Sequence, residues 1–177
     1  MSVETEFLSA AIANFQEIKT VVDRAIAQVD DEQFFAALDG ESNSIAVIVK
    51  HVAGNLRSRW TDFLTSDGEK ADRDRDSEFE MGDSATRAEL MSGWEDGWRL
   101  AFQTLNGLTP DDVMKTIRIR GEPHTVVKAI IRQLTHAANH GGQIVFLAKH
   151  FAGGAWQTVS IPRAPKSNRA KAPSGDR

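Results

Sequence analysis

The chain of 177 residues contains no cysteine, which excludes several kinds of chemistry at once. Disulfide bonds, thiolate metal ligands and a cysteine nucleophile are all ruled out. A bound metal ion must therefore be held by histidine, aspartate or glutamate, ligands that suit zinc, nickel, iron or manganese. No apolar run approaches the roughly 18 residues of a membrane-spanning helix, and the acidic start Met-Ser-Val-Glu-Thr-Glu does not resemble a signal peptide. We therefore expect a cytoplasmic protein without a membrane partner.

Charge is unevenly distributed along the chain, whose formal net charge is −4. Residues 163–177 carry five basic residues and one acid, which leaves a net charge of about −8 on the rest. An acidic body is a poor surface for a phosphate backbone, which argues against nucleic acid as the main partner. We expect one domain over residues 1–162 and a basic, disordered tail over 163–177. Nucleic-acid binding through residues 166–177 is the alternative role of this tail.

Apolar residues recur at helical spacing in four segments, which predicts amphipathic helices over about 4–29, 44–64, 84–105 and 124–151. Before the last of these, Ile117 and Ile119 alternate with polar residues and precede Gly121, a pattern typical of one arm of a short β-hairpin. Residues 66–83 hold eight acids and three bases, which predicts a solvated loop. The expected fold is an all-α four-helix bundle with at most one short hairpin before the fourth helix.

Three of the five histidines form a candidate metal site. His136 and His140 are four residues apart, so both lie on one helix face. They lack the glutamate of the zinc-protease motif His-Glu-x-x-His, so protease chemistry is not indicated. On helical wheels this pair and His51 each lie beside an apolar stripe, where side chains of facing helices converge. Three imidazoles would leave coordination positions open for water or substrate.

Spacing alone leaves a second interpretation of these histidines open. His51 can equally be a hydrogen-bonded packing residue, and His136 with His140 an exposed pair that becomes cationic at low pH. His124 and His150 are interpreted as structural or solvated. The two interpretations of the three histidines are evenly matched at this point.

Other polar residues of the second predicted helix allow several roles. Arg59 falls near the centre of the apolar stripe, so it must extend outward, pair with a carboxylate such as Asp62, or meet an anionic group of a substrate. Asn55 lies one turn after His51 and can hydrogen-bond a metal-bound ligand or take a surface role. Three tryptophans are expected in the core: Trp60, Trp94 and Trp98. The fourth, Trp156, is free to cover the end of the bundle or to contact a partner.

Three stretches of the chain resemble the DinB-like superfamily of bacterial four-helix bundles, in a branch without an assigned reaction. They are Glu-Ser-Asn-Ser-Ile-Ala-Val-Ile-Val-Lys-His (41–51), Arg-Trp-Thr-Asp-Phe-Leu-Thr-Ser-Asp-Gly-Glu-Lys (59–70) and His-Ala-Ala-Asn-His-Gly-Gly-Gln-Ile (136–144). With the order of helices, the resemblance covers about residues 4–161. It implies that His51, His136 and His140 form a metal triad. It also implies an up-down-down-up bundle with a long crossover, and often a homodimer.

The resemblance further implies a class of reaction. The best-understood members of the superfamily transfer low-molecular-weight thiols such as bacillithiol or mycothiol to electrophiles, with the metal activating the thiolate. The chain is therefore expected to be a divalent-metal-dependent enzyme, a small-thiol transferase or a hydrolase of small electrophiles. The alternative is a non-catalytic, dimeric, stress-related binding or scaffold module. The sequence contains no clear catalytic triad and no glycine-rich phosphate loop that would name a reaction by itself.

Overall fold

The computed structural model describes residues 2–162. Its elements are α1 (Val3–Ile26), α2 (Asp31–Phe35), α3 (Ile45–Trp60), η1 (Asp76–Phe79), α4 (Arg87–Gly107), η2 (Pro110–Asp112), β1 (Thr116–Ile119), β2 (Glu122–Thr125), α5 (Val126–Ala152) and η3 (Gly153–Ala155). The predicted all-α bundle with one hairpin before the last long helix is confirmed. None of the described helices is both long and apolar enough to cross a membrane. The predicted tail, 163–177, lies outside the described residues.

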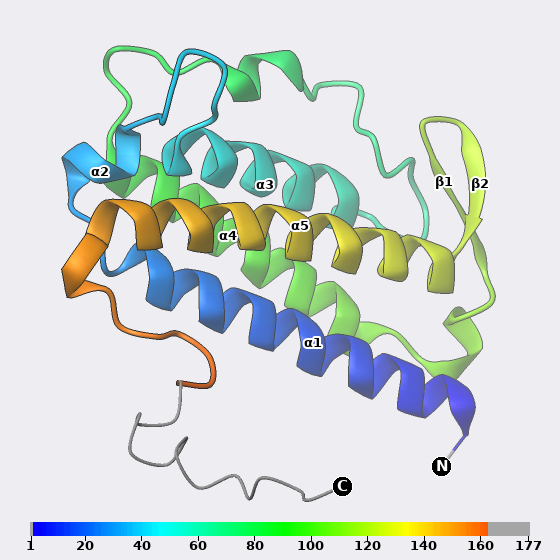
Figure 1. Cartoon of the computed structure of the whole chain (residues 1–177). Coiled ribbons are helices and arrows are strands. Elements are labelled where there is room, and N and C mark those ends of the chain that lie inside the picture. The colour runs from blue at the N-terminus through cyan, green and yellow to red at the C-terminus, as the bar shows by residue number, and fades with distance from the viewer. Residues whose placement is uncertain (1, 163–177) are drawn as a thin grey trace, which may run out of the picture.

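The four long helices pack as two pairs, α3 against α4 and α1 against α5. Figure 1 shows α3 and α4 running in the same direction, opposite to α1 and α5. Parallel neighbours cannot be joined by a short turn, so the chain between them, residues 61–86, runs back along the bundle as a long crossover. This crossover loop lies over α3, and its η1 turn contacts that helix.

Hydroxyl side chains cap the long helices, because each oxygen accepts a backbone N–H that the first helical turn leaves unpaired. The caps are Ser2, Ser44, Thr86 and Thr125, in chain order. Several boundaries differ from the sequence prediction, and the first helix ends at Ile26 and not near 29. Helix α3 ends at Trp60, because the chain turns at Asp62 with a φ of 47°, and α4 begins at Arg87 rather than near 84. His124 lies in β2 and not in the last helix.

Aromatic rings fill the centre of the bundle. Phe15 of α1 is fully buried and packs edge-to-face against two tryptophans. Its ring centroid lies 6.0 Å from that of Trp60 and 6.2 Å from that of Trp98. The predicted core position of Trp60, Trp94 and Trp98 is confirmed, since each is 1% exposed. Trp156 is partly buried and packs against the end of the same core. These rings thus pack α1, α3 and α4 together at the centre of the bundle.

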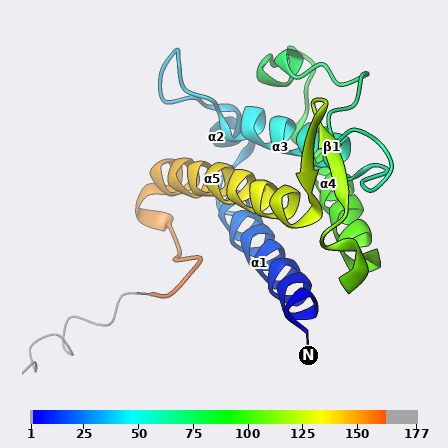
Figure 2. The same ribbon diagram turned by 90° about the vertical axis from the view of Figure 1, so that its right-hand side faces the viewer.

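The hairpin and the crossover loop are tied together at one end of the bundle (Figure 2). Strands β1 and β2 are antiparallel, with Thr116 opposite Thr125 and Ile119 opposite Glu122. The two-residue turn between them has positive φ at both Arg120, 56°, and Gly121, 78°, as a type I′ turn requires. Both turn amides donate to the carboxylate of Asp67 at 2.8 Å. This carboxylate therefore holds the crossover loop against the hairpin.

Candidate metal centre

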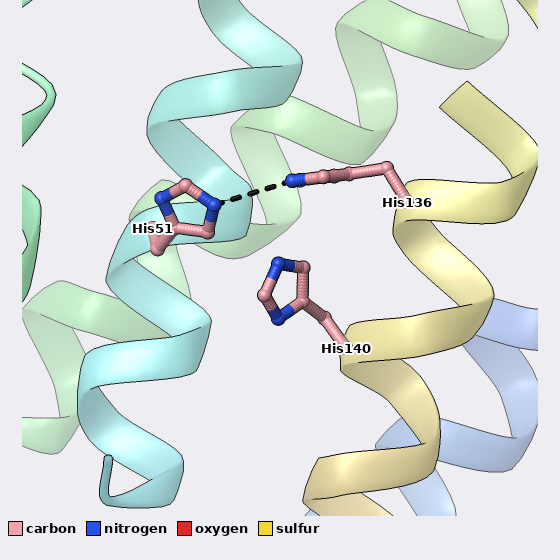
Figure 3. A group of neighbouring side chains, drawn as sticks. All are labelled: His51, His136 and His140. Carbon is pink, nitrogen blue, oxygen red and sulfur yellow. Dashed lines mark hydrogen bonds between the residues drawn. The ribbon is translucent and has the colours of Figure 1, made fainter. Parts of the chain in front are cut away.

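The three histidines predicted as ligands lie together in the structure, as Figure 3 shows. His51 comes from the middle of α3, and His136 and His140 come from successive turns of the antiparallel helix α5. One ring nitrogen of each lies within 4.8 Å of the others. Their ring centroids are 4.6 to 5.2 Å apart. The packing of α5 across α3 thus brings together residues that are 85 positions apart in the chain.

Two of the rings are oriented by hydrogen bonds on the side away from the cluster. His51 Nδ1 lies 2.8 Å from the carboxylate of Glu78, and His140 Nδ1 lies 2.8 Å from Oε1 of Gln143. Because both partners are oxygen acceptors, each Nδ1 donates a hydrogen bond to its partner, and each Nε2 is left to face the cluster. This arrangement, with an acceptor behind the histidine, is the one that supports metal-ligating imidazoles in proteins.

Glu78 is itself held in place from the far side. Arg73 donates to both of its carboxylate oxygens at 2.8 Å and also contacts Glu69. Burial raises the pKa of Glu78, but the hydrogen bonds from His51 and Arg73 outweigh burial, so the pKa lies below its usual value. Gly54 of α3 makes room for the carboxylate, since a Cβ at that position would lie 2.8 Å from Cδ of Glu78. An ionised carboxylate therefore sits directly against α3.

The rings of His51 and His136 approach each other at hydrogen-bond distance. Their Nε2 atoms are 3.2 Å apart, and Nδ1 of His136 is buried without a hydrogen-bond partner among the described residues. Burial first, then the neighbouring positive charges, lowers the pKa of His136 to about 3. Burial also lowers the pKa of His140. A proton on Nε2 of His136 can bridge this pair, and a divalent ion that replaces the proton would find three imidazole nitrogens within reach, so the donor set fits a divalent ion.

The histidines open into a cavity of about 540 Å³. Phe79 of η1 packs against one side of His51, with ring centroids 4.7 Å apart. Two buried amides also line the cavity, Asn55 at 7% exposure and Gln133 at 2%. Asn55 Oδ1 and Gln133 Nε2 have no hydrogen-bond partner among the described residues. The histidines are thus next to a space that a small molecule can enter.

A family model described as "Protein of unknown function (DUF1572)" matches residues 2–165, which include the whole described bundle. The chain belongs to this family. A comparison with curated proteins found no match. The three histidines and the residues that support them therefore all lie within the part of the chain that defines the DUF1572 family.

Some predictions about this DUF1572 chain need correction. The crossover loop is not simply solvated, because Glu78 is 6% exposed and the side chain of Arg73 is 6% exposed. Arg59 does not extend outward, since it is 5% exposed. Nor does it pair with Asp62: across residues 2–162, no carboxylate lies within 4.0 Å of its guanidinium.

The remaining histidines are outside the cluster, as expected. His124 Nδ1 bonds to the backbone oxygen of Glu122 at 3.0 Å, and His150 is exposed at the end of α5. Four contributing residues were not predicted: Arg73, Glu78, Gln133 and Gln143. The last two have a detectable signal, because they lie three residues from His136 and His140 on the same helix flank.

Proposed function

We propose that this DUF1572 protein is a divalent-metal-dependent enzyme of the DinB-like type. His51, His136 and His140 would hold a zinc, nickel, iron or manganese ion. The reaction would join a nucleophile, a low-molecular-weight thiol or water, to a small electrophile. Two observations support this assignment: the chain belongs to the DUF1572 family, and three of its stretches resemble DinB-like proteins.

The observation that carries the proposal is the convergence of three imidazoles around one point while Glu78 and Gln143 hold two of them from behind. Histidines that serve only packing do not need three rings that converge beside a cavity, two of them held from behind by hydrogen bonds. The pKa of His136, lowered to about 3, keeps that ring neutral and able to donate its lone pair at physiological pH. Three protein ligands also leave positions free for substrate.

Each part of the chain has a distinct role in this proposal. A divalent ion, when bound, supplies the positive charge that favours the deprotonated form of a thiol or water. The chain, having no cysteine, cannot supply a thiol itself, so the nucleophile comes from solution. Glu78 fixes the ring of His51, and Phe79 covers one face of that ring against water. Asn55 and Gln133 present amide groups to whatever enters the cavity.

Thermal unfolding with and without metal tests the proposal. Full-length protein purified without a histidine tag would be stripped with a chelator and titrated with Zn²⁺, Ni²⁺, Mn²⁺ or Fe²⁺. A ligand that binds only the folded state at about 100 times its Kd stabilises it by about 2.7 kcal/mol, so the midpoint should rise by several degrees. His51→Ala should abolish the rise, and His150→Ala, an exposed control, should keep it. No rise with any ion would contradict the proposal and favour a scaffold role.

An activity assay then separates the transferase from the hydrolase. Metal-loaded protein would be mixed with a small thiol and chlorodinitrobenzene. In thiol transfer the sulfur forms a bond to the ring carbon, chloride leaves, and the thiol proton is released to solvent. A rate that depends on added metal and is lost in His136→Ala supports thiol transfer. A metal-dependent release of chloride without consumption of thiol supports hydrolysis.

A further inference from the structure

The cavity beside the histidines is strongly basic, in a chain whose net charge is −4. No aspartate or glutamate is among its lining residues. Five arginines line it: Arg59, Arg73, Arg75, Arg120 and Arg132. Three of these have carboxylate partners. Arg73 and Arg120 contact Glu69, Arg73 also contacts Glu78, and Arg75 contacts Asp76. These three charges are therefore compensated within the protein.

Arg59 and Arg132 are not compensated in this way. Across residues 2–162, neither has a carboxylate within 4.0 Å. Arg59 is 5% exposed, and its Nε has no hydrogen-bond partner among the described atoms. Burial, and then the charge of Arg132, lowers the pKa of Arg59 to about 10, so the guanidinium stays protonated at pH 7. A buried, charged guanidinium without a partner is strongly unfavourable, which points to a partner that comes from outside the protein.

The positions of these arginines follow from the helix geometry. On α3, His51, Asn55 and Arg59 succeed one another every four residues, and on α5 so do Arg132, His136 and His140. Residues spaced by four lie along one helix face. Because α3 and α5 run in opposite directions (Figure 1), the histidine ends of the two rows lie at the same level, and so do the arginine ends. A rise of 1.5 Å per residue separates the ends by about 6–12 Å.

A second buried side chain of the cavity, Gln133, also lacks a hydrogen-bond partner among the described residues. Gln133 neighbours Arg132 in sequence, is 2% exposed, and its Nε2 has no acceptor among the described residues. A second donor in the cavity that Arg59 lines suits an oxyanion, which accepts several hydrogen bonds at once. Gly68 of the crossover loop allows the loop to lie directly on Arg59, because a Cβ there would approach the Arg59 Cδ at 3.0 Å. The loop thus keeps the guanidinium inside the cavity.

We propose that this cavity binds a small molecule through an oxyanionic group, a carboxylate or a phosphate. Arg59 and Gln133 donate to the group, Arg132 adds charge at the rim, and the rest of the molecule extends about 6–12 Å to the histidines. This inference rests on the proposed function, since it names the class of molecule that would react at the metal.

Calorimetric titration of the full-length, metal-free protein with succinate and, separately, with inorganic phosphate tests this binding. One anion per chain is expected, and Arg59→Gln should weaken it at least about tenfold, the loss of one charge-assisted hydrogen bond. Arg99→Gln is the matched control, because it removes the same charge from an exposed site on α4 outside the cavity. Succinamide, a neutral analogue, should not bind. Whichever of the two anions binds identifies the oxyanion.

Arg132→Gln keeps the test decisive if Arg59→Gln does not fold, since Arg132 is exposed and its loss leaves the core unchanged. This variant should weaken binding by about two- to threefold, a typical effect for a rim charge. Equal affinity in Arg59→Gln and Arg99→Gln, or no binding of either anion, would overturn the inference. Anion binding that requires added metal and His136 but not Arg59 would overturn it as well.

Metal binding measured on the same variants separates the two proposals. Arg59→Gln should bind metal like the unmodified chain, because Arg59 is not a ligand in either proposal. If metal binds but anions do not, the oxyanion site is wrong and the metal enzyme stands. If anions bind through Arg59 but no metal binds, the metal enzyme is wrong and only the anion site stands.

Discussion

The Glu78 carboxylate lies 2.8 Å from Nδ1 of His51, although the two residues are 27 positions apart and belong to different elements. Helix α3 supplies the histidine, and the η1 turn of the crossover loop supplies the carboxylate. A loop that connects two parallel helices therefore also sets the orientation of one ring in the candidate metal centre.

Replacing Glu78 by glutamine should weaken metal binding. The variant keeps the shape of the side chain but removes the charge that orients His51 and pairs with Arg73. Loss of a supporting carboxylate typically lowers metal affinity about 10–100-fold. Competition with a chromophoric chelator measures this affinity. Glu80→Gln, an exposed neighbour, is the control and should behave like the unmodified chain. Identical affinities for both variants would contradict a supporting role for Glu78.

Substituting alanine for Gly54 should also weaken metal binding, although Gly54 is not a ligand. The added methyl group would meet the Glu78 carboxylate, which Arg73 and His51 already hold from other sides. We expect a loss of affinity comparable to that of Glu78→Gln.

Gly93→Ala on α4 is the matched control, because nothing lies within 4 Å of a Cβ there. A glycine-to-alanine change inside a helix normally stabilises it by about 1 kcal/mol. Gly93→Ala should therefore raise the unfolding midpoint and leave metal affinity unchanged. Full metal affinity in Gly54→Ala would contradict this prediction, because it would show that metal binding does not depend on the position of the Glu78 carboxylate.

The free energy of unfolding should depend on Asp112 in a defined pH range. Its carboxylate accepts from Lys115 at 2.7 Å and from the backbone and hydroxyl of Thr109, and these bonds lower its pKa to about 2. A depressed folded-state pKa means that the contribution is complete above the unfolded value of 3.8 and is lost as the pH falls towards about 2. Asp112→Asn should thus be clearly less stable than the unmodified chain at pH 7.

Urea unfolding of both proteins between pH 7 and pH 2 measures this effect. The difference in unfolding free energy should shrink mainly between about pH 4 and pH 2. Lys149→Gln, in the exposed last turn at the other end of α5, should show a difference that does not change over this range. A constant difference for Asp112→Asn would contradict the assigned ion pair.

The sequence predicted the fold and the histidines because both depend on local periodicity. The positions of Phe15, Trp60 and Trp98 within apolar stripes determine which helix faces are buried. The same stripes place His51, and the pair in α5, at their edges. That pattern alone left the three histidines evenly matched between a metal site and packing residues. The DinB-like resemblance favoured a single triad, and the packing of α5 across α3 brings the three rings together.

The supporting residues could not be predicted in the same way. Glu78 and Arg73 belong to a segment with no periodicity and many charges, and its composition is that of an exposed loop. Their burial depends on long-range contacts: Asp67 binding the hairpin turn, and Gly54 leaving space on α3. Phe79, a large apolar residue within this acidic segment, was the one sign that part of the loop packs inward. The sequence predicted that Arg59 needs a partner. It could not show which groups surround Arg59, because these include Arg132 and Gln133 of α5, a helix distant in the chain.

A crystal structure of the full-length, tag-free protein grown with Zn²⁺, with data collected at the zinc absorption edge, tests the metal centre most directly. We predict one anomalous peak about 2.0–2.1 Å from Nε2 of His51, His136 and His140. We also expect the hydrogen bond between Glu78 and His51 to persist. No peak at the three histidines at saturating Zn²⁺, with the rings still clustered, would contradict the metal centre and leave these residues as packing groups.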